Sequence, residues 1–407
     1  MKEWEARMEW IDAATASERL GVKPATLYAY VSRGVLRRRH SDDGRRSLFS
    51  AEEVEQLARR GRPRSQPPEL VIDSAVTALG PDRPYFRGLD ALDLARSHDY
   101  ESVAAWLWTG APAALTSGGG DGWECDEVAL RAAQTAQHGL PGDLLPLDRL
   151  QVITTVLGAS DGLRFQLDPA SVADTGRRLV AGLVDALPQR SEPAGTSIAE
   201  RLWSRLTARP AEPPLLRALQ AALVLLADHE LAASTLAARV AASARADPYA
   251  VVQTGLGVLG GPLHGGASYG AERLLAEVGE AGLAGRAVAE RVRRGERVPG
   301  FGHSVYRNGD GRGALLFGLV EEAAPGHERL AVAHALRDEA RRRRLPDPNV
   351  DFALATLAAV SGMPPGAGEA VFAVARTAGW LAHAMEEYAR GTLLRLRASY
   401  TGPPITR

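Results

Sequence analysis

The sequence predicts an all-α body preceded by a small module of mixed helix and strand. From about residue 70 onward, apolar residues recur at the i, i+3, i+4 spacing of amphipathic helices. Strand signals in that region are few and short. Residues 1–65 differ from the rest, because they contain 14 Lys or Arg and 10 Asp or Glu, a local net charge of +4 against −1 for the whole chain.

Composition narrows the class of protein. At 407 residues the chain is long enough for two or three domains. Its single cysteine, Cys125, excludes an internal disulfide framework and a multi-cysteine zinc site. The N-terminus lacks the apolar run of a signal peptide, and no apolar stretch reaches the roughly 20 residues that span a bilayer. We therefore expect a cytoplasmic protein with no membrane partner.

The first 62 residues are expected to fold as a separate domain. Thr15–Leu20 and residues 24–31 predict two short helices joined by a tight turn, which is a helix-turn-helix pattern. Residues 37–46 predict a hairpin with an Asp-Gly turn. Ser50 then begins a third helix, with Glu53 placed to complete a capping box.

This arrangement resembles the winged helix-turn-helix domain of the MerR and excisionase type. The resemblance implies that the second helix enters the major groove of DNA and that the hairpin contacts the backbone. The alternative is a module used for protein contacts or dimerisation. The matching segments are Ala16–Val22, Thr26–Tyr28, Gly34–Leu36 and Arg46–Ser50. The side chains expected to face DNA are Lys23, Thr26, Tyr30, Arg33, Arg45 and Arg46.

The body begins after a proline-containing linker at residues 63–69. Val71-Ile72 and Tyr85–Arg87 predict a small edge hairpin near its start. The segment from Gly255 to Gly260 matches GxGxxG, but it follows a helical stretch rather than a strand, so we reject it as a dinucleotide site. Amphipathic helices are expected at Leu89–Arg96, Tyr100–Trp108, Leu144–Leu157, Val172–Leu187 and Leu215–Ala227.

A glycine-rich turn from Gly260 to Ala267 carries His264 at its centre. Glycine permits close backbone approach, so His264 is either a catalytic group or part of a tight helix–helix connection. Further histidines, carboxylates and arginines follow beside other Gly or Pro turns. Such groups can remove a proton beside a carbonyl, stabilise an enolate and hold a dianion. No pair of histidines has i, i+4 spacing and no compact ligand motif is present, so we expect no metal.

Several separate motifs follow one another along the body of the chain. They are Tyr85–Gly88, Ala104–Gly110, Asp228–Leu231, Asp247–Tyr249, Gly261–Gly266, Pro299–His303, Pro348–Asp351 and Ala375–Trp380. In this order they resemble the citrate synthase family from about residue 70 to the C-terminus.

The resemblance implies a role for each matching residue. Asp351 would remove a methyl proton from acetyl-CoA, His264 would donate a hydrogen bond to the thioester oxygen, and His303 would polarise the ketone of oxaloacetate. The expected oxaloacetate carboxylate ligands are His229, Arg312, Arg376 and Arg395. The expected CoA-binding residues are Val298, Pro299, Gly300, Phe301, Gly302, Arg307 and Arg344.

The resemblance also implies an architecture and a reaction. A large domain of residues 70–267 and 356–407 would enclose a small domain of residues 268–355, in a homodimer to which Arg395 contributes across the interface. No cofactor is expected, because the CoA thioester is itself a substrate of this acyltransferase. Asp310-Gly311-Arg312 replaces the family's Asp-Pro-Arg, which predicts a looser loop around Arg312.

Two alternatives to citrate synthase activity stay open. The chain could be a 2-methylcitrate synthase that uses propionyl-CoA, since one methylene alters binding by only ~1–3 kcal/mol in an apolar pocket. It could also be a DNA-binding regulator whose body senses acyl-CoA or oxaloacetate. The presence of Asp351 favours an enzyme, because a sensor does not need a proton-abstracting base.

Overall fold

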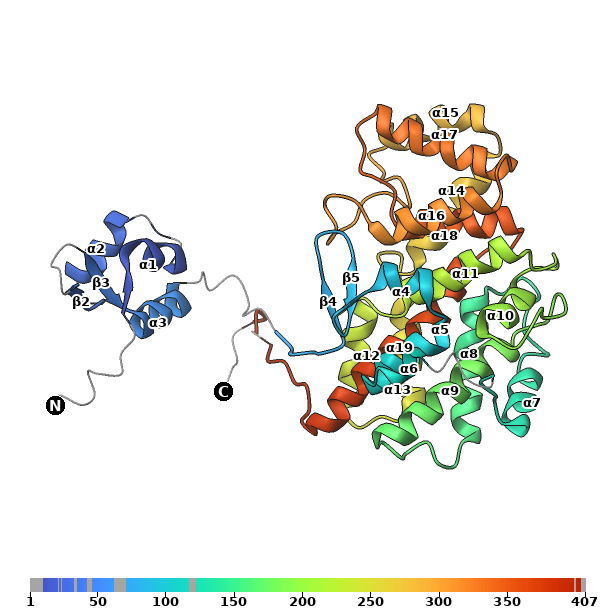
Figure 1. Ribbon diagram of the computed structural model, residues 1–407, viewed down its shortest axis with the longest axis horizontal. Helices are drawn as coiled ribbons and strands as arrows, with labels where there is room; N and C mark the ends of the chain where they lie inside the picture. The colour runs from blue at the N-terminus through green and yellow to red at the C-terminus, as the bar shows by residue number, and fades with distance from the viewer. Residues whose placement is uncertain are drawn as a thin grey trace. The chain divides into compact units, whose positions relative to one another are not determined.

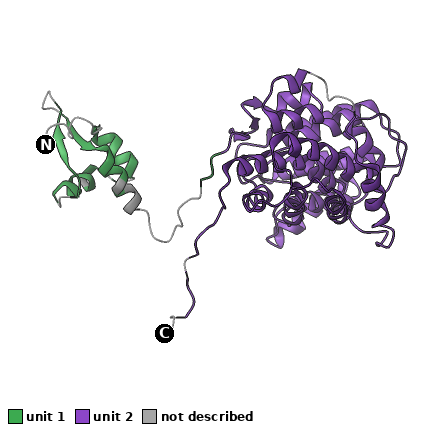
Figure 2. Cartoon of the chain, turned by 90° about the horizontal axis from the view of Figure 1, so that it is seen from below, with its two compact units in different colours: residues 1–73 green, residues 74–407 purple. Residues whose placement is uncertain are grey.

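A computed structural model describes residues 10–20, 22, 24–32, 35–41, 46–61, 71–116, 122–398 and 400–403. The chain divides into two units, residues 1–73 and 74–407 (Figure 2). The expected linker at residues 63–69 lies outside the described residues. None of the described helices is both long and apolar enough to cross a membrane.

The N-terminal unit combines helices with one antiparallel sheet whose strand order is β1-β3-β2. Helices α1 and α2 pack together, and Leu27 and Phe49 are among the fully buried core residues. Strand β1 was not predicted; it pairs with β3 from Trp10 opposite Ser50. The elements are β1 (Trp10–Asp12), α1 (Ala13–Leu20), α2 (Pro24–Ser32), β2 (Arg38–His40), β3 (Ser47–Ser50) and α3 (Ala51–Gly61).

The third helix starts as predicted, but the predicted capping box is wrong, because the Glu53 carboxylate does not accept the backbone N–H of Ser50. Ser50 Oγ accepts the backbone N–H of Glu53 at 3.5 Å. The carboxylate of Glu53 instead accepts the backbone N–H and the Nε–H of Arg37, at 2.7 and 2.5 Å. The side chain of Glu53 therefore ties the hairpin to α3.

The second unit begins with a three-stranded antiparallel sheet, β4 (Thr77–Leu79), β5 (Pro84–Phe86) and β6 (Leu89–Asp90). The predicted strand at Val71-Ile72 is wrong, because β4 supplies the partner of β5. The helix predicted from Leu89 begins two residues later, since Leu89 pairs with Phe86 and Asp90 caps the helix.

The rest of this unit is helical, which confirms the predicted all-α class. Helices α14 to α18 gather at one end of the unit in Figure 1. The helices are α4 (Ala91–Ser97), α5 (Tyr100–Thr109), α6 (Ala113–Thr116), α7 (Glu127–Thr135), α8 (Pro146–Ser160), α9 (Pro169–Asp185), α10 (Ile198–Leu206), α11 (Pro213–Leu226), α12 (Ala233–Ser243), α13 (Pro248–Leu259), α14 (Gly266–Val278), α15 (Ala284–Arg293), α16 (Gly311–Ala323), α17 (Glu328–Arg342), α18 (Val350–Ser361) and α19 (Ala367–Arg390).

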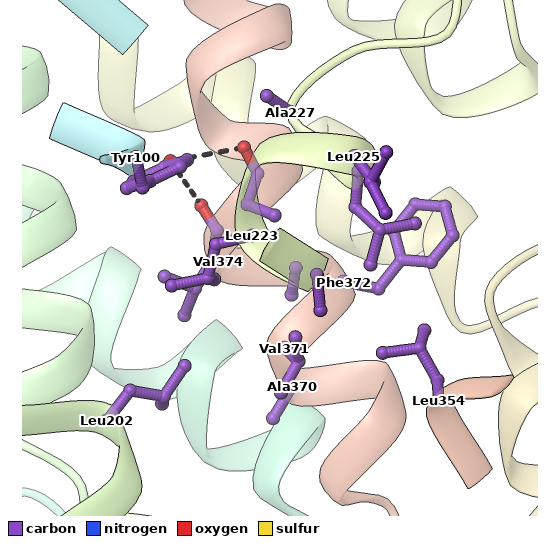
Figure 3. Close-up of a cluster of buried hydrophobic side chains, with 14 of the residues drawn as sticks. Tyr100, Leu202, Leu223, Leu225, Ala227, Leu354, Ala370, Val371, Phe372 and Val374 are labelled. Carbon is purple, nitrogen blue, oxygen red and sulfur yellow. Dashed lines mark hydrogen bonds between the residues drawn. The ribbon is translucent and has the colours of Figure 1, made fainter. Parts of the chain in front are cut away.

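Helix α19 forms the centre of the core. It is buried at every position from Ala367 to Ala384, and it packs against α5, α9, α11, α12 and α13. Tyr100 on α5 donates its hydroxyl to the carbonyls of Val374 and Ala375, at 2.8 and 3.1 Å (Figure 3). Gly255 lies on α13 against Trp380, so the GxGxxG segment is helical and packs on α19. Side chains from Ala367 to Ala384 thus lie in the interior.

Candidate active site

His264 lies in the turn between α13 and α14. The carbonyl of Gly261 closes this turn, because it accepts the backbone N–H of His264 at 2.9 Å and that of Gly266 at 3.2 Å. A Cβ at Gly266 would lie 2.9 Å from the same carbonyl oxygen, so only glycine fits there. The imidazole Nε2 of His264 lies 2.7 Å from Ser234 Oγ.

The contacts of Ser234 favour one tautomer of His264. Trp380 donates its Nε1–H to Ser234 Oγ at 3.2 Å, and His264 Nε2 is an acceptor within reach of the Ser234 hydroxyl. Burial and the positive charge of Arg376 lower the pKa of His264 to about 4, so the ring is neutral at pH 7. From this network we assign the ring proton to Nδ1, which leaves one N–H donor to offer to an acceptor.

His303 folds back over its own loop. Its Nδ1 accepts the backbone N–H groups of Val305 and Tyr306, at 3.1 and 3.2 Å, so the ring proton lies on Nε2. Burial and the charge of Arg312 lower the pKa of His303 to about 4. Arg312 Nη2 lies 3.3 Å from Nε2. With the ring proton on Nε2, an oxygen acceptor beside these two nitrogens would have one N–H donor on each of them.

Arg312 is fixed by a buried ion pair with Asp310. The guanidinium donates from Nε and Nη2 to the two carboxylate oxygens, at 3.0 and 2.9 Å. Asp310 also accepts the backbone N–H groups of Arg312 and Val350, both at 3.1 Å, which joins the starts of α16 and α18. Gly311 donates its N–H to the carbonyl of Asp82 at 2.8 Å. The loop around Arg312 is thus held by contacts with Asp310 and Asp82, and its looseness relative to an Asp-Pro-Arg loop stays a prediction.

Arg376 on α19 is fully buried with two unpaired nitrogens. Its Nε donates to the carbonyl of Leu226 at 2.8 Å, and its guanidinium lies 4.6 Å from the ring centre of Phe372. Neither Nη1 nor Nη2 has a hydrogen-bond partner among the described residues. Burial lowers the pKa of Arg376 to about 10. A buried cation with two free donors is suited to hold a carboxylate.

His229 lies just after α11, in a segment pinned to α19. Gly379 donates its N–H to the carbonyl of Ala227 at 3.0 Å, and a Cβ at Gly379 would lie 2.2 Å from Asp228 Oδ1. The ring centre of His229 lies 5.4 Å from that of His303. Burial first, and then the nearby arginines, hold the pKa of His229 well below its ordinary value, so this ring is also neutral.

Asp351 lies in the first turn of α18, where Asn349 caps the helix and accepts its backbone N–H at 3.0 Å. Ser268 donates its hydroxyl to Asp351 Oδ1 at 2.7 Å. Oδ2 makes no hydrogen bond with the described residues. Burial raises the pKa of Asp351 to about 6, against the lowering effect of Ser268 and Arg312. Asp351 is therefore a partly buried carboxylate that is ionised at pH 7, with one oxygen free to act as a base.

The loop Val298–Gly302 is anchored to the segment before α18. Gly300 and Gly302 have φ values of 81° and 82°, which favour glycine. Gly302 donates its N–H to the carbonyl of Asp347 at 2.8 Å and accepts the side-chain amide of Asn349 at 2.9 Å. Asn349 donates its backbone N–H to Gly300 O at 2.9 Å. The loop thus presents its backbone beside the residue that caps the helix of Asp351.

A cavity of about 320 Å³ adjoins this loop. His303, Arg307 and residues 345–349 line it. Arg307 is exposed and can reach an anionic group at the mouth of this cavity. Arg344 is exposed and has a φ of 55°, but it does not line the cavity.

The structure brings six predicted side chains together and leaves one apart. The charges of Arg312 and Arg376 act on His229 and Asp351, which places these groups within electrostatic reach of one another. Arg395 is exposed in the extended segment after α19 and forms no hydrogen bond or ion pair with the described residues. The six that are brought together are His229, His264, His303, Arg312, Asp351 and Arg376.

The DNA-facing candidates are only partly described. Thr26 and Arg46 are exposed, and Tyr30 is half-buried. Lys23, Arg33 and Arg45 lie outside the described residues.

Sequence reasoning missed three hydroxyl groups that contact the site. Ser234, Ser268 and Tyr306 hydrogen-bond to His264, Asp351 and His229 across 30, 83 and 77 residues of sequence. Ser234 and Tyr306 stand beside recognised motifs, but nothing in a single sequence pairs a hydroxyl with a distant ring or carboxylate.

Comparison with known proteins gives one consistent result. A family model described as "Citrate synthase, C-terminal domain" matches residues 69–397. Citrate synthase 2 of Bacillus subtilis is 31% identical over 364 residues, covering 82% of this chain and 94% of that protein. 2-Methylcitrate synthase 2 of Corynebacterium glutamicum is 28% identical, covering 78% and 88%. The crystal structure of citrate synthase from Thermotoga maritima aligns with a TM-score of 0.70 at 26% identity, covering 84% of this chain and 97% of that one.

Proposed function

The chain belongs to the citrate synthase family, and we propose that it condenses acetyl-CoA with oxaloacetate and hydrolyses the product to citrate and CoA. The observation that carries this proposal is Arg376, whose two buried terminal nitrogens have no partner among the described residues. A buried guanidinium with two nitrogens that lack a hydrogen bond is costly unless a ligand supplies the acceptors. A carboxylate of oxaloacetate would accept two parallel hydrogen bonds from it.

The other side chains proposed to bind the oxo acid are also suited to oxaloacetate. His303 Nε2 and Arg312 Nη2 lie 3.3 Å apart, so one oxygen of the substrate would be within reach of both. Because the ring of His303 is neutral, it polarises the ketone by hydrogen bonding and does not transfer a full charge. His229, whose ring centre lies 5.4 Å from that of His303, would hold a carboxylate of the same ligand.

Asp351 and His264 would activate the acetyl group. Asp351 Oδ2 takes a proton from the methyl carbon, and His264 Nδ1–H stabilises the oxygen of the resulting enol or enolate. The methyl carbon then bonds to the ketone carbon of oxaloacetate, and the ketone oxygen gains a proton. Water cleaves the thioester of citryl-CoA, which gives citrate and CoA.

The CoA moiety would lie along Val298–Gly302. The cavity of about 320 Å³ that adjoins this loop is large enough for part of the CoA molecule. Arg307 at the cavity, and Arg344 further along the surface, would contact phosphate groups.

We extend the proposal to the architecture. Residues 268–355 would move as a small domain against residues 70–267 and 356–407, and closure would exclude water from Asp351. Exposed Arg395 would serve the site of a second subunit, so the working form would be a homodimer. Its position after α19, away from the six grouped side chains, supports a role across an interface.

A thiol-release assay tests the condensation directly. Wild-type protein should release CoA from acetyl-CoA only when oxaloacetate is present. Asp351→Asn should lower the rate by on the order of 1000-fold, since it keeps the shape but removes the base. Equal activity in both proteins would refute the mechanism.

The acyl group preferred by the chain needs its own measurement. Relatives named citrate synthase and 2-methylcitrate synthase match over similar lengths, so propionyl-CoA is the competing substrate. We expect a higher kcat/KM for acetyl-CoA in parallel assays. A higher kcat/KM for propionyl-CoA would assign the chain to 2-methylcitrate formation instead.

A second role, binding of duplex DNA, is proposed for the N-terminal unit. It is supported by the exposure of Arg38 and Arg46 in the hairpin that follows two packed short helices. The full chain should bind DNA with an affinity that falls as salt rises, and Arg38→Ala with Arg46→Ala should reduce that salt dependence. Ligand-dependent DNA binding without any CoA release would favour a regulator over an enzyme.

A further inference from the structure

Tyr306 contacts three of the side chains proposed to hold the oxo acid. Its hydroxyl lies 2.9 Å from His229 Nε2. Its ring stacks on His303, with centroids 4.7 Å apart and planes 21° from parallel. The guanidinium of Arg312 lies over the same ring, 5.2 Å from its centre. The side chain is only 2% exposed, so these contacts are made in the interior.

Tyr306 acts on His303 in two ways. Its backbone N–H donates to His303 Nδ1 at 3.2 Å, which helps to keep the ring proton on Nε2. Its stacked ring sets the plane in which that Nε2–H points. Both contacts come from one residue three positions away, so the loop itself orients the group that would polarise the ketone.

The hydroxyl of Tyr306 gives His229 a partner in either neutral tautomer. A phenol both donates and accepts, so it completes a hydrogen bond at Nε2 whichever ring nitrogen carries the proton. Without the hydroxyl, this buried nitrogen would lose the partner that the structure gives it. A buried polar atom without a partner is costly, and the ring could rotate to find another.

We propose that Tyr306 is a positioning residue for the oxo acid, whose hydroxyl orients His229 and whose ring orients His303 and Arg312 toward the bound dicarboxylate. The inference rests on the oxaloacetate site of the proposed function. It assigns separate tasks to two parts of one side chain, the hydroxyl and the ring, and substitution can remove them one at a time.

Two variants and a control test this assignment. Tyr306→Phe keeps the ring and should raise both the KM and the Kd for oxaloacetate about tenfold, with kcat within about twofold and the KM for acetyl-CoA unchanged. Tyr306→Leu removes the ring as well and should also lower kcat by about tenfold. Tyr249→Phe removes another largely buried hydroxyl, which lies 2.8 Å from Asp161 Oδ2, and should leave all these constants unchanged.

The outcomes separate this inference from the proposed function. An unchanged or lower KM and Kd for oxaloacetate in Tyr306→Phe would overturn the positioning role, as would equal effects in the Tyr249→Phe control. Wild-type protein that binds oxaloacetate but releases no CoA would refute the condensation, and the Kd of Tyr306→Phe would still decide the role of Tyr306. Wild-type protein that binds no oxaloacetate would overturn both.

Discussion

Ser268 Oγ donates a hydrogen bond of 2.7 Å to Asp351 Oδ1 and makes no such bond to Oδ2. The hydroxyl belongs to α14, two residues after that helix begins, and the carboxylate belongs to the first turn of α18. The contact therefore fixes the orientation of the proposed base relative to the His264 turn, which leads directly into α14.

Replacing Ser268 should change the pH dependence of the reaction. Asp351 must be ionised to act as a base, so kcat/KM should fall as pH drops through its pKa of about 6. The hydroxyl of Ser268 lowers that pKa, so Ser268→Ala should move the acid limb upward by roughly one unit and reduce kcat about tenfold. Ser268→Thr keeps the donor and serves as the control; an identical acid limb in Ala and wild type would contradict the argument.

Asp351→Asn should gain stability while it loses activity. The pKa of Asp351 is raised from 3.8 to about 6 in the folded chain, so folding opposes its ionised form. This penalty is absent below pH 3.8, grows up to about pH 6 and is then constant, at roughly 3 kcal/mol for a shift of this size. Melting temperatures of the two proteins should therefore differ more at pH 8 than at pH 4.5. If the variant melts at a lower temperature than wild type at pH 8, the ionised carboxylate of Asp351 does not destabilise the folded protein.

Arg376 and Arg239 are both fully buried. Substitution of Arg239 should lower the stability of the protein, whereas substitution of Arg376 should weaken substrate binding. Arg239 is paired with Glu387 and Glu386, at 2.6 and 2.7 Å, so Arg239→Met should cost about 3–5 kcal/mol of stability. Arg376 has two unpaired nitrogens, so Arg376→Met should keep stability within about 1 kcal/mol of wild type. It should instead raise the KM for oxaloacetate on the order of 100-fold.

Thermal denaturation with and without oxaloacetate distinguishes these two arginines. Oxaloacetate should raise the melting temperature of wild type but not that of Arg376→Met. If oxaloacetate stabilises Arg376→Met as strongly as wild type, the unpaired nitrogens do not bind the substrate.

The loop proposed to hold CoA depends on Gly300. At its φ of 81°, an added Cβ would lie 2.9 Å from the Cβ of Phe352 and 3.1 Å from that of Ala271. Gly300→Ala should therefore cost roughly 2–4 kcal/mol of stability and raise the KM for acetyl-CoA. Gly295→Ala is the matched control, because φ is 71° and no atom lies within 4 Å of its Cβ. Its cost should be about 1 kcal/mol, with an unchanged KM. If the two variants lose the same stability and have the same KM for acetyl-CoA, the contact with Phe352 does not determine the conformation of the loop.

Local patterns predicted most helices because their signals are carried by neighbouring residues. Tyr100–Trp108 was predicted from its periodicity and forms α5, where Asp99 supplies the N-cap. The predicted strand at Val71-Ile72 is wrong because the signal for a strand is not carried by neighbouring residues alone. Pairing depends on a partner, and Tyr85 lies opposite Ala78 in a strand with little sequence signal of its own.

The sequence by itself determined the helical class, the motif order that implies the family, and the six polar side chains that the fold brings together. Tertiary structure alone decided what those side chains can do. Backbone N–H groups place the proton of His303 on Nε2, and the contact with Ser234 favours a proton on Nδ1 of His264. Arg376 is buried with two donors that have no partner in the described part of the chain. Protonation and hydrogen-bond capacity depend on desolvation and on partners tens of residues away, and a linear pattern records neither.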